Sequence, residues 1–261
     1  GGCGKTRIVN LVLTALFTEY YGPRGVVKAA PSNKAARGIL GKTLHAAGKI
    51  GCGAMNIQSL SCDEKAKAAL ASLWAPAGAL IIDEAPQGAV AVYHALALRS
   101  TYGRAAAHGL DIAQYAEPAT TFGAMPIVIE CGDELQLPVV PSTAGFFADL
   151  DGTSTLHCAG VDIFRQKDYV YKLTTMKRFT DPILISVLTK MRKSGGCKLT
   201  KEEWAALQAT DISELPVAEQ QRRLRGTDLW YQSGFTWAVV AMAQVIRSRL
   251  SATQAKATLY F

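Results

Sequence analysis

Short apolar runs alternate with longer stretches whose apolar residues recur at helical spacing, and these two patterns predict strands and helices in turn. The predicted strands are short and mostly apolar, and they are Gly25–Ala30, Ala79–Ile82, Pro126–Cys131 and Tyr169–Leu173. The predicted helices carry an apolar face, a stop signal or a proline in the first turn, and they are Arg7–Tyr21, Asn33–Leu40, Asp63–Trp74 and Pro182–Arg192. Residues 41–43 read as a loop, and the chain from Lys201 onward as mostly helical. Strands that alternate with helices indicate an α/β domain with a largely parallel sheet.

Polar residues follow three of the predicted strands directly. Ser32 comes after the first strand, Asp83–Glu84 after the second and Gly132–Asp133 after the third. In open parallel sheets, ligands bind beyond the carboxyl ends of the strands. We therefore expect one ligand site at that edge of the sheet.

The chain opens with Gly-Gly-Cys-Gly-Lys-Thr, which matches the end of the phosphate-loop pattern G-x-x-x-x-G-K-T. Gly2 and Gly4 allow backbone N–H groups to turn onto phosphate oxygens, and the helix that follows offers its positive end. Lys5 would neutralise the β- and γ-phosphates, and Thr6 would reach Mg²⁺. The pattern indicates a site for ATP and Mg²⁺; the alternative is a glycine turn followed by a helix cap.

Two adjacent carboxylates, Asp83 and Glu84, end an apolar strand. This arrangement suits a pair in which Asp83 holds Mg²⁺ through water and Glu84 orients an attacking water. A solvated acidic turn is the alternative for the pair alone.

A third polar motif, Gly132–Pro138, reads Gly-Asp-Glu-Leu-Gln-Leu-Pro. The neutral amide of Gln136 could donate a hydrogen bond to a γ-phosphate and lose that contact after hydrolysis. Such a group acts as a sensor of the phosphate and not as an acid or a base.

Composition narrows the class of protein. Hydrophobic residues make up 49% of the chain and charged residues 19%, which excludes a disordered protein. The net charge of +7 favours a polyanionic partner. Six cysteines without a C-x-x-C pair argue against a zinc knuckle or a disulfide framework, and favour free thiols in a reducing compartment. The uncharged run Leu229–Ile246 includes several polar residues, so we expect a buried or amphipathic helix there and no membrane partner.

Five segments in order resemble the successive motifs of the petite-integration-frequency helicases, in the B branch of superfamily one and related to RecD. They are residues 1–6, 29–50, 80–85, 128–140 and 171–179. The resemblance covers residues 1 to about 193, and its specific parts are Gly132–Pro138 and the block at 29–50. It implies a RecA-like P-loop NTPase domain, truncated at both ends, with a mostly parallel sheet flanked by helices. Residues 1–193 would form the first ATPase domain without its first strand, and residues 194–261 a mostly helical continuation towards a second motor domain.

The resemblance also implies a function: ATP- and Mg²⁺-dependent unwinding of DNA in the 5′-to-3′ direction, in repair, recombination or telomere maintenance. Its partners would be single-stranded DNA and DNA junctions. Its location would be intracellular, in the nucleus or mitochondrion of a eukaryote and otherwise in the cytoplasm. We expect the present segment not to unwind DNA on its own.

Matched motif by motif, the resemblance assigns roles to individual residues. Lys5 and Thr6 fall in the phosphate loop, Asp83 resembles the metal carboxylate, and Glu84 the residue that activates water. The γ-phosphate contact matches Gln136, and Arg178 stands where the family has an arginine that reaches the phosphates. The block after the first predicted strand resembles the family's track for single-stranded DNA, with Ser32, Asn33, Lys34, Lys42, Thr43 and His45 as donors to phosphates and sugars.

The sequence departs from the family after Glu84, where Ala85–Gly88 replaces a stretch that begins Ile-Ser-Met. A proline at position 86 could alter the orientation of the glutamate. Two other functions therefore stay open: a non-catalytic nucleic-acid-binding module descended from a motor, and a P-loop phosphotransferase that acts on a small molecule.

Overall fold

The structure is a computed structural model that describes residues 2–51, 64–109, 121–133, 139, 145–147, 155–191, 198–208 and 216. The chain divides into two compact units, Gly1–Cys197 and Lys198–Phe261. The sheet and every predicted site residue that is described belong to the first unit. In the second unit, helix α11 (Lys201–Gln208) is described.

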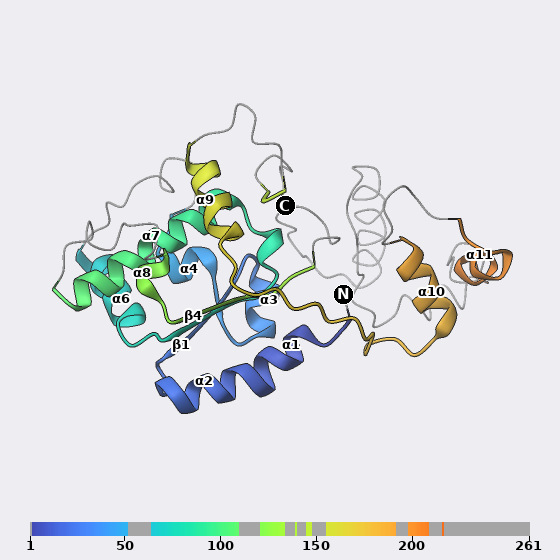
Figure 1. The fold of residues 1–261 in the computed structure, drawn as a ribbon, viewed down its shortest axis with the longest axis horizontal. Helices are drawn as coiled ribbons and strands as arrows, with labels where there is room; N and C mark the ends of the chain where they lie inside the picture. The colour runs from blue at the N-terminus through green and yellow to red at the C-terminus, as the bar shows by residue number, and fades with distance from the viewer. Residues whose placement is uncertain are drawn as a thin grey trace, which may run out of the picture. The chain divides into compact units, whose positions relative to one another are not determined.

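Four parallel strands form the centre of the first unit (Figure 1). They are β1 (Val26–Ala30), β2 (Lys42–Thr43), β3 (Ala79–Ile82) and β4 (Ile127–Glu130), in the order β2-β1-β3-β4. The register pairs Ala29 with Ile82 and Ile82 with Glu130, so the carboxyl ends of β1, β3 and β4 lie level. The predicted α/β class with a parallel sheet is confirmed, as are the three strands predicted within residues 25–131.

The central strand β3 is buried along its whole length. It pairs on both sides, and helices cover both faces, which explains why its sequence is a continuous apolar run. Alternate side chains enter two different cores: Leu80 and Ile82 pack in one, and Ala79 and Ile81 in the other.

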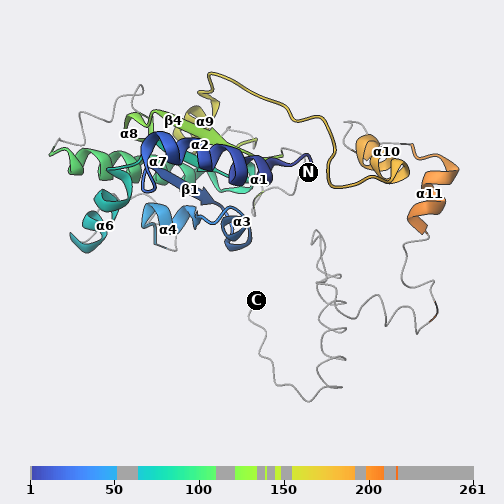
Figure 2. The ribbon, with the colours of Figure 1, turned by 90° about the horizontal axis from the view of Figure 1, so that it is seen from below.

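One face of the sheet is covered by the helical run that starts at the phosphate loop and by α3 (Asn33–Gly38) (Figures 1 and 2). The run consists of α1 (Lys5–Ile8), a π-helical turn at Val9–Leu13 and α2 (Thr14–Tyr21). It confirms the helix predicted from Arg7 and begins two residues before it. Val9 and Phe17 are its buried contacts with the sheet.

The opposite face carries the larger core, which is centred on helix α7. The helices of this layer are α4 (Leu44–Gly48), α6 (Glu64–Trp74), α7 (Val90–Ala107), α8 (Thr121–Ala124) and α9 (Thr155–Arg165). Trp74 is fully buried there and donates from Nε1 to the carbonyl of Ala47 at 3.2 Å. The last helix of the first unit is α10 (Pro182–Met191), close to the predicted one.

Two predictions about strands are wrong. Tyr169–Leu173 is not a strand but irregular, exposed chain, with Val170 and Tyr171 exposed by 85% and 86%. It pairs with no strand in the described part of the chain, and without a partner an apolar run cannot form a ladder. Conversely, the predicted loop at 41–43 contains β2, because Lys42 and Thr43 pair with the end of β1.

No described helix has the length and apolar character needed to cross a membrane. The uncharged run Leu229–Ile246 lies outside the described residues.

Candidate nucleotide site

The phosphate-loop glycines have the backbone conformation that their role requires. Gly2 and Gly4 have φ angles of +88° and +91°, a region that favours glycine. A Cβ atom at Gly2 would also lie 2.7 Å from Sδ of Met176, whereas Gly4 faces open space. Gly4 is the N-cap of α1, so the loop runs directly into the positive end of a helix.

Asp83 lies at the end of β3 and is only 2% exposed. It accepts hydrogen bonds from Thr6 Oγ1 at 3.4 Å and from the backbone N–H of Glu84 at 3.0 Å. Burial raises the pKa of Asp83, while the Glu84 N–H, the Lys5 ammonium and the Thr6 hydroxyl act in the opposite direction. The fold therefore brings a hydroxyl and a carboxylate together at the carboxyl edge of the sheet, as predicted.

Glu84 turns its side chain towards the phosphate loop. Its Oε1 atom lies 3.9 Å from Nζ of Lys5, and its Oε2 atom is buried without a hydrogen-bond partner. Burial raises the pKa of Glu84, Lys5 lowers it, and the negative charges of Asp83 and Asp133 raise it further. A buried carboxylate oxygen without a donor is rare, and a water molecule would satisfy it.

The backbone at Glu84 is in the left-handed region, with φ +52° and ψ +36°. This conformation is uncommon for a residue with a side chain and is concentrated at functional sites. A hydrogen bond to the next strand stabilises this turn: the N–H of Ala85 donates to the carbonyl of Cys131, which follows β4, at 2.9 Å. A Cβ atom at Gly132 would lie only 2.2 Å from Cδ of Pro86, so the proline packs closely against the end of β4. The proline at position 86 therefore does not turn the Glu84 side chain away from Lys5.

Arg178, which comes late in the sequence of the first unit, contacts the same loop through its backbone. The backbone N–H groups of Lys177 and Arg178 both donate to the carbonyl of Gly2, at 2.9 and 3.0 Å. Gln136, the predicted sensor, lies outside the described residues; Asp133 of the same motif is described and is 8% exposed.

The predicted DNA-contacting residues lie after the carboxyl end of β1 or beside it. Ser32 and Thr43 cap α3 and α4, accepting from Ala35 N and Ala46 N at 3.2 and 3.1 Å. The rest of the set is exposed or half-buried: Asn33, Lys34, Lys42 and His45. Whether these residues bind DNA stays a prediction.

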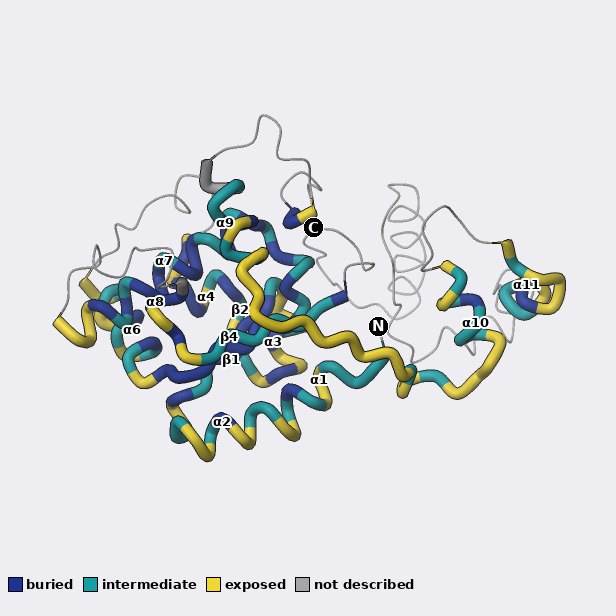
Figure 3. The backbone as a smooth tube through the Cα atoms, in the orientation of Figure 1, coloured by how far each residue is buried: buried dark blue, intermediate teal, exposed yellow. Residues whose placement is uncertain are grey.

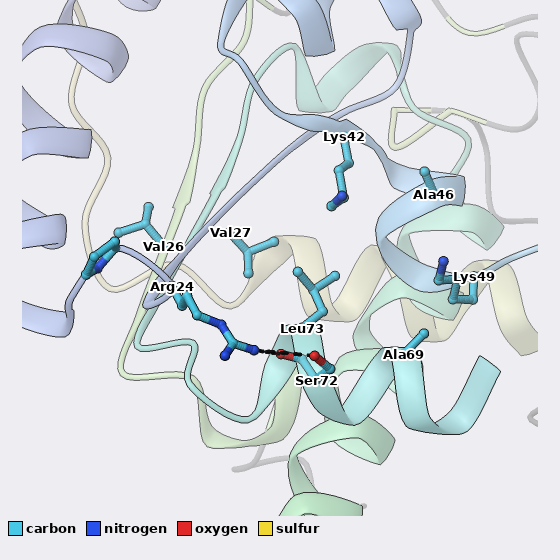
Figure 4. Close-up of a pocket in the computed structure, with 10 residues that line it drawn as sticks. Arg24, Val26, Val27, Lys42, Ala46, Lys49, Ala69, Ser72 and Leu73 are labelled. Carbon is cyan, nitrogen blue, oxygen red and sulfur yellow. Dashed lines mark hydrogen bonds between the residues drawn. The ribbon is translucent and has the colours of Figure 1, made fainter. Parts of the chain in front are cut away.

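Lys42 also borders a separate open groove of about 430 Å³ beside β1 (Figure 4). Arg24, from the turn before β1, and Lys49, which follows α4, also line it, and Val27 and Leu73 provide apolar surface. Arg24 donates from Nη2 to the carbonyl and hydroxyl oxygens of Ser72, at 3.1 and 3.3 Å. Its lining includes no residue of the phosphate loop, so it is not the nucleotide site.

A nucleotide and Mg²⁺ fit the residues at the carboxyl edge. The loop provides positive-φ glycines, a helix N-terminus and an ammonium group for phosphates. Mg²⁺ is usually bound by one or two carboxylates together with substrate phosphates; Asp83 provides a carboxylate, and Thr6 provides a hydroxyl oxygen beside it. The described residues contain no cluster of three or more His, Cys, Asp or Glu side chains that would suggest another kind of metal centre.

The comparisons agree with this fold. The chain resembles Pif1 helicase from Bacteroides in complex with ADP-AlF3 and ssDNA, with 21% identity and a TM-score of 0.56 over 83% of this chain and 45% of that one. It also resembles Pif1 helicase from Candida albicans, with 23% identity and a TM-score of 0.56 over 82% of this chain and 43% of that one. The present chain thus spans less than half the length of either, and at these identities the likeness shows a shared fold.

No curated protein matches the chain. The family model described as PIF1-like helicase matches residues 1–148, more than half of the sequence. The chain therefore belongs to the PIF1-like helicase family.

Proposed function

We propose that residues 1–193 are the first RecA-like ATPase domain of a DNA helicase, which couples ATP hydrolysis to movement along single-stranded DNA. One observation carries this proposal. Lys5, Thr6, Asp83 and Glu84 come from two distant parts of the sequence and meet at the carboxyl edge of one parallel sheet.

Each side chain has a distinct task in this proposal. Lys5 offsets the negative charge of the β- and γ-phosphates. The unpaired Oε2 atom of Glu84 accepts a hydrogen bond that the attacking water donates. Thr6 and Asp83 are the residues that would hold Mg²⁺, which neutralises charge that develops on the phosphates. Arg178, whose backbone N–H donates to the carbonyl of Gly2, contacts the phosphates in this proposal, and Gln136 senses the γ-phosphate.

The DNA partner is proposed from the family and from the basic charge of the chain. A related Pif1 was solved with ssDNA, and another similar structure concerns DNA unwinding at forked dsDNA by two coordinating Pif1 helicases. We extend these to single-stranded DNA and DNA junctions as partners here, with unwinding in the 5′-to-3′ direction. We also propose roles in repair, recombination or telomere maintenance, and an intracellular location: nuclear or mitochondrial in a eukaryote and otherwise cytoplasmic.

The test is ATP hydrolysis by the full-length protein with and without single-stranded DNA, for the wild type and for Lys5→Ala. Lys65→Ala, which removes an exposed lysine of α6, is the matched control. We expect DNA-stimulated hydrolysis that Lys5→Ala abolishes and Lys65→Ala leaves unchanged. Equal hydrolysis by wild type and Lys5→Ala would favour the non-catalytic binding module. Hydrolysis that is indifferent to DNA would favour the small-molecule phosphotransferase.

A further inference from the structure

A charged cluster lies at the end of β4, just before the motif Gly132–Pro138. Glu130 is the last residue of the strand, and its side chain is only 6% exposed. Its Oε2 atom lies 2.5 Å from Nζ of Lys167, which follows the end of α9. A buried charge needs a partner of opposite sign, and Lys167 provides it.

The other oxygen of Glu130 accepts a hydrogen bond from the hydroxyl of Tyr93, a buried residue of α7. Burial, with the adjacent charge of Glu130, raises the pKa of Tyr93, so the hydroxyl stays protonated and continues to donate. Aromatic rings surround the tyrosine edge-on, with centroids at 5.5 Å for Phe122 and 5.1 Å for Phe146. These contacts hold Glu130 in one place.

Lys167 lies near the start of a mostly exposed, irregular stretch that runs from the end of α9 to the start of α10; we call residues 166–181 the connecting segment (Figure 3). The Lys167 ammonium lies 4.6 Å from the centroid of the Phe164 ring, which adds a cation–π contact to the ion pair. At its near end, the connecting segment is therefore fixed to β4 by the ion pair with Glu130 and to α9 by the Phe164 ring.

Towards its far end, the connecting segment is attached to the phosphate loop. The N–H groups of Lys177 and Arg178 donate to the Gly2 carbonyl, and Met176 and Phe179 pack at the position of a Gly2 Cβ. Between the two attachments, Tyr169 and Tyr171 are exposed, and their rings stack on each other with centroids 6.5 Å apart. The segment is thus attached at both ends.

We propose that Glu130 is a positioning residue: by holding Lys167, it fixes the connecting segment so that the far end places Arg178 beside the phosphate loop. This inference rests on the proposed ATPase function. It adds a residue to which the motif comparison gave no role, and it links the strand before Gly132–Pro138 to the arginine.

Kinetics of ATP hydrolysis by the full-length protein test this role with Lys167→Met, which keeps the length of the side chain and removes its charge. We expect kcat to fall roughly 10- to 100-fold with little change in KM, because the arginine is misplaced while nucleotide binding is intact. Lys167→Arg should retain most of the activity. Lys172→Met is the matched control, because Lys172 lies on the same exposed segment and has no partner among the described residues.

Two further measurements separate positioning from a general loss of stability. In an Arg178→Ala background, Lys167→Met should cause no further loss of kcat, because both changes remove the same contribution. Trypsin should cut after Lys172 several-fold faster in Lys167→Met and Glu130→Gln than in the wild type, since a released segment is open more of the time.

Wild-type kcat together with wild-type cleavage after Lys172 in Lys167→Met would overturn the inference. Losses that multiply in the Lys167→Met, Arg178→Ala double variant would also overturn it. The proposed function fails separately, if Lys5→Ala hydrolyses ATP as well as the wild type; the cleavage assay still tests the segment in that case.

Discussion

Thr6 Oγ1 lies 3.4 Å from Oδ2 of Asp83, although 77 residues separate the two in the sequence. The hydroxyl belongs to the first turn of α1 and the carboxylate to the end of β3. A parallel sheet brings such residues together because successive strands end at the same edge. This contact is what makes a joint Mg²⁺ site possible.

Replacing the Thr6 hydroxyl tests that site. Thr6→Val keeps the shape of the side chain and removes the oxygen, so we expect weaker binding of a fluorescent ATP analogue when Mg²⁺ is present and unchanged binding when it is chelated. Thr6→Ser retains the oxygen and should bind as the wild type does. A loss of affinity for Thr6→Val that is equal with and without Mg²⁺ would contradict the metal role.

Glu84→Gln should separate binding from hydrolysis. The amide keeps the size of the side chain but is a poor acceptor for a water proton, so we expect ATP hydrolysis to fall roughly 10²- to 10⁴-fold. Nucleotide affinity should change little, because Glu84 is not expected to contact the phosphates. Glu64→Gln, at an exposed glutamate of α6, is the control and should hydrolyse ATP at the wild-type rate.

The same carboxylate gives a pH-dependent term in stability. Burial raises the pKa of Glu84 above its ordinary value of 4.5. At pH values between the ordinary pKa and the raised pKa, the folded state binds more protons than the unfolded state. The unfolding free energy therefore falls as the pH rises through this window. Below the ordinary value the contribution of Glu84 is fully favourable, and above the raised value it is lost.

Unfolding of Glu84→Gln by denaturant, at neutral pH and near pH 4, checks this sign. We expect the variant to be more stable than the wild type at neutral pH, and the difference to shrink as the pH falls. A wild type that is the more stable of the two at neutral pH would show that the pairing with Lys5 outweighs burial.

Gly132 should not tolerate a side chain. A Cβ atom there would lie 2.2 Å from Cδ of Pro86, and overpacking of this kind costs roughly 1–3 kcal/mol. We expect Gly132→Ala to lower the unfolding free energy by such an amount, and Pro86→Ala to recover part of it in the double variant. Gly38→Ala is the control, because the nearest atom to its Cβ is 4.0 Å away. Equal midpoints for the two alanine variants would refute the clash.

The sequence was informative where the signal is local. The apolar run Ala79–Ile82 followed by two acids predicted both β3 and the place of its carboxylates, because burial on two faces leaves a continuous apolar pattern. The glycines of the phosphate loop were equally readable, since few residues other than glycine adopt their φ angles.

Features that depend on a distant partner could not be read in this way. Tyr169–Leu173 has a strand's composition, but a strand also needs a neighbour to pair with, and composition does not supply one. Two further features depend on how β4 and α9 pack: the left-handed turn at Glu84 and the ion pair between Glu130 and Lys167. No spacing of residues in the sequence predicts either feature. The predicted role of Gln136 is untested, because that residue lies outside the described part of the chain.

Two amides share the single carbonyl of Gly2. A peptide unit is planar and trans, so its C=O and the N–H that follows point in opposite directions. Anchoring the Gly2 oxygen from one side therefore aims the Cys3 N–H to the other side, and limits rotation of that whole unit. By binding the Gly2 oxygen, residues 177 and 178 consequently set the orientation of the Cys3 N–H, a hydrogen-bond donor of the phosphate loop.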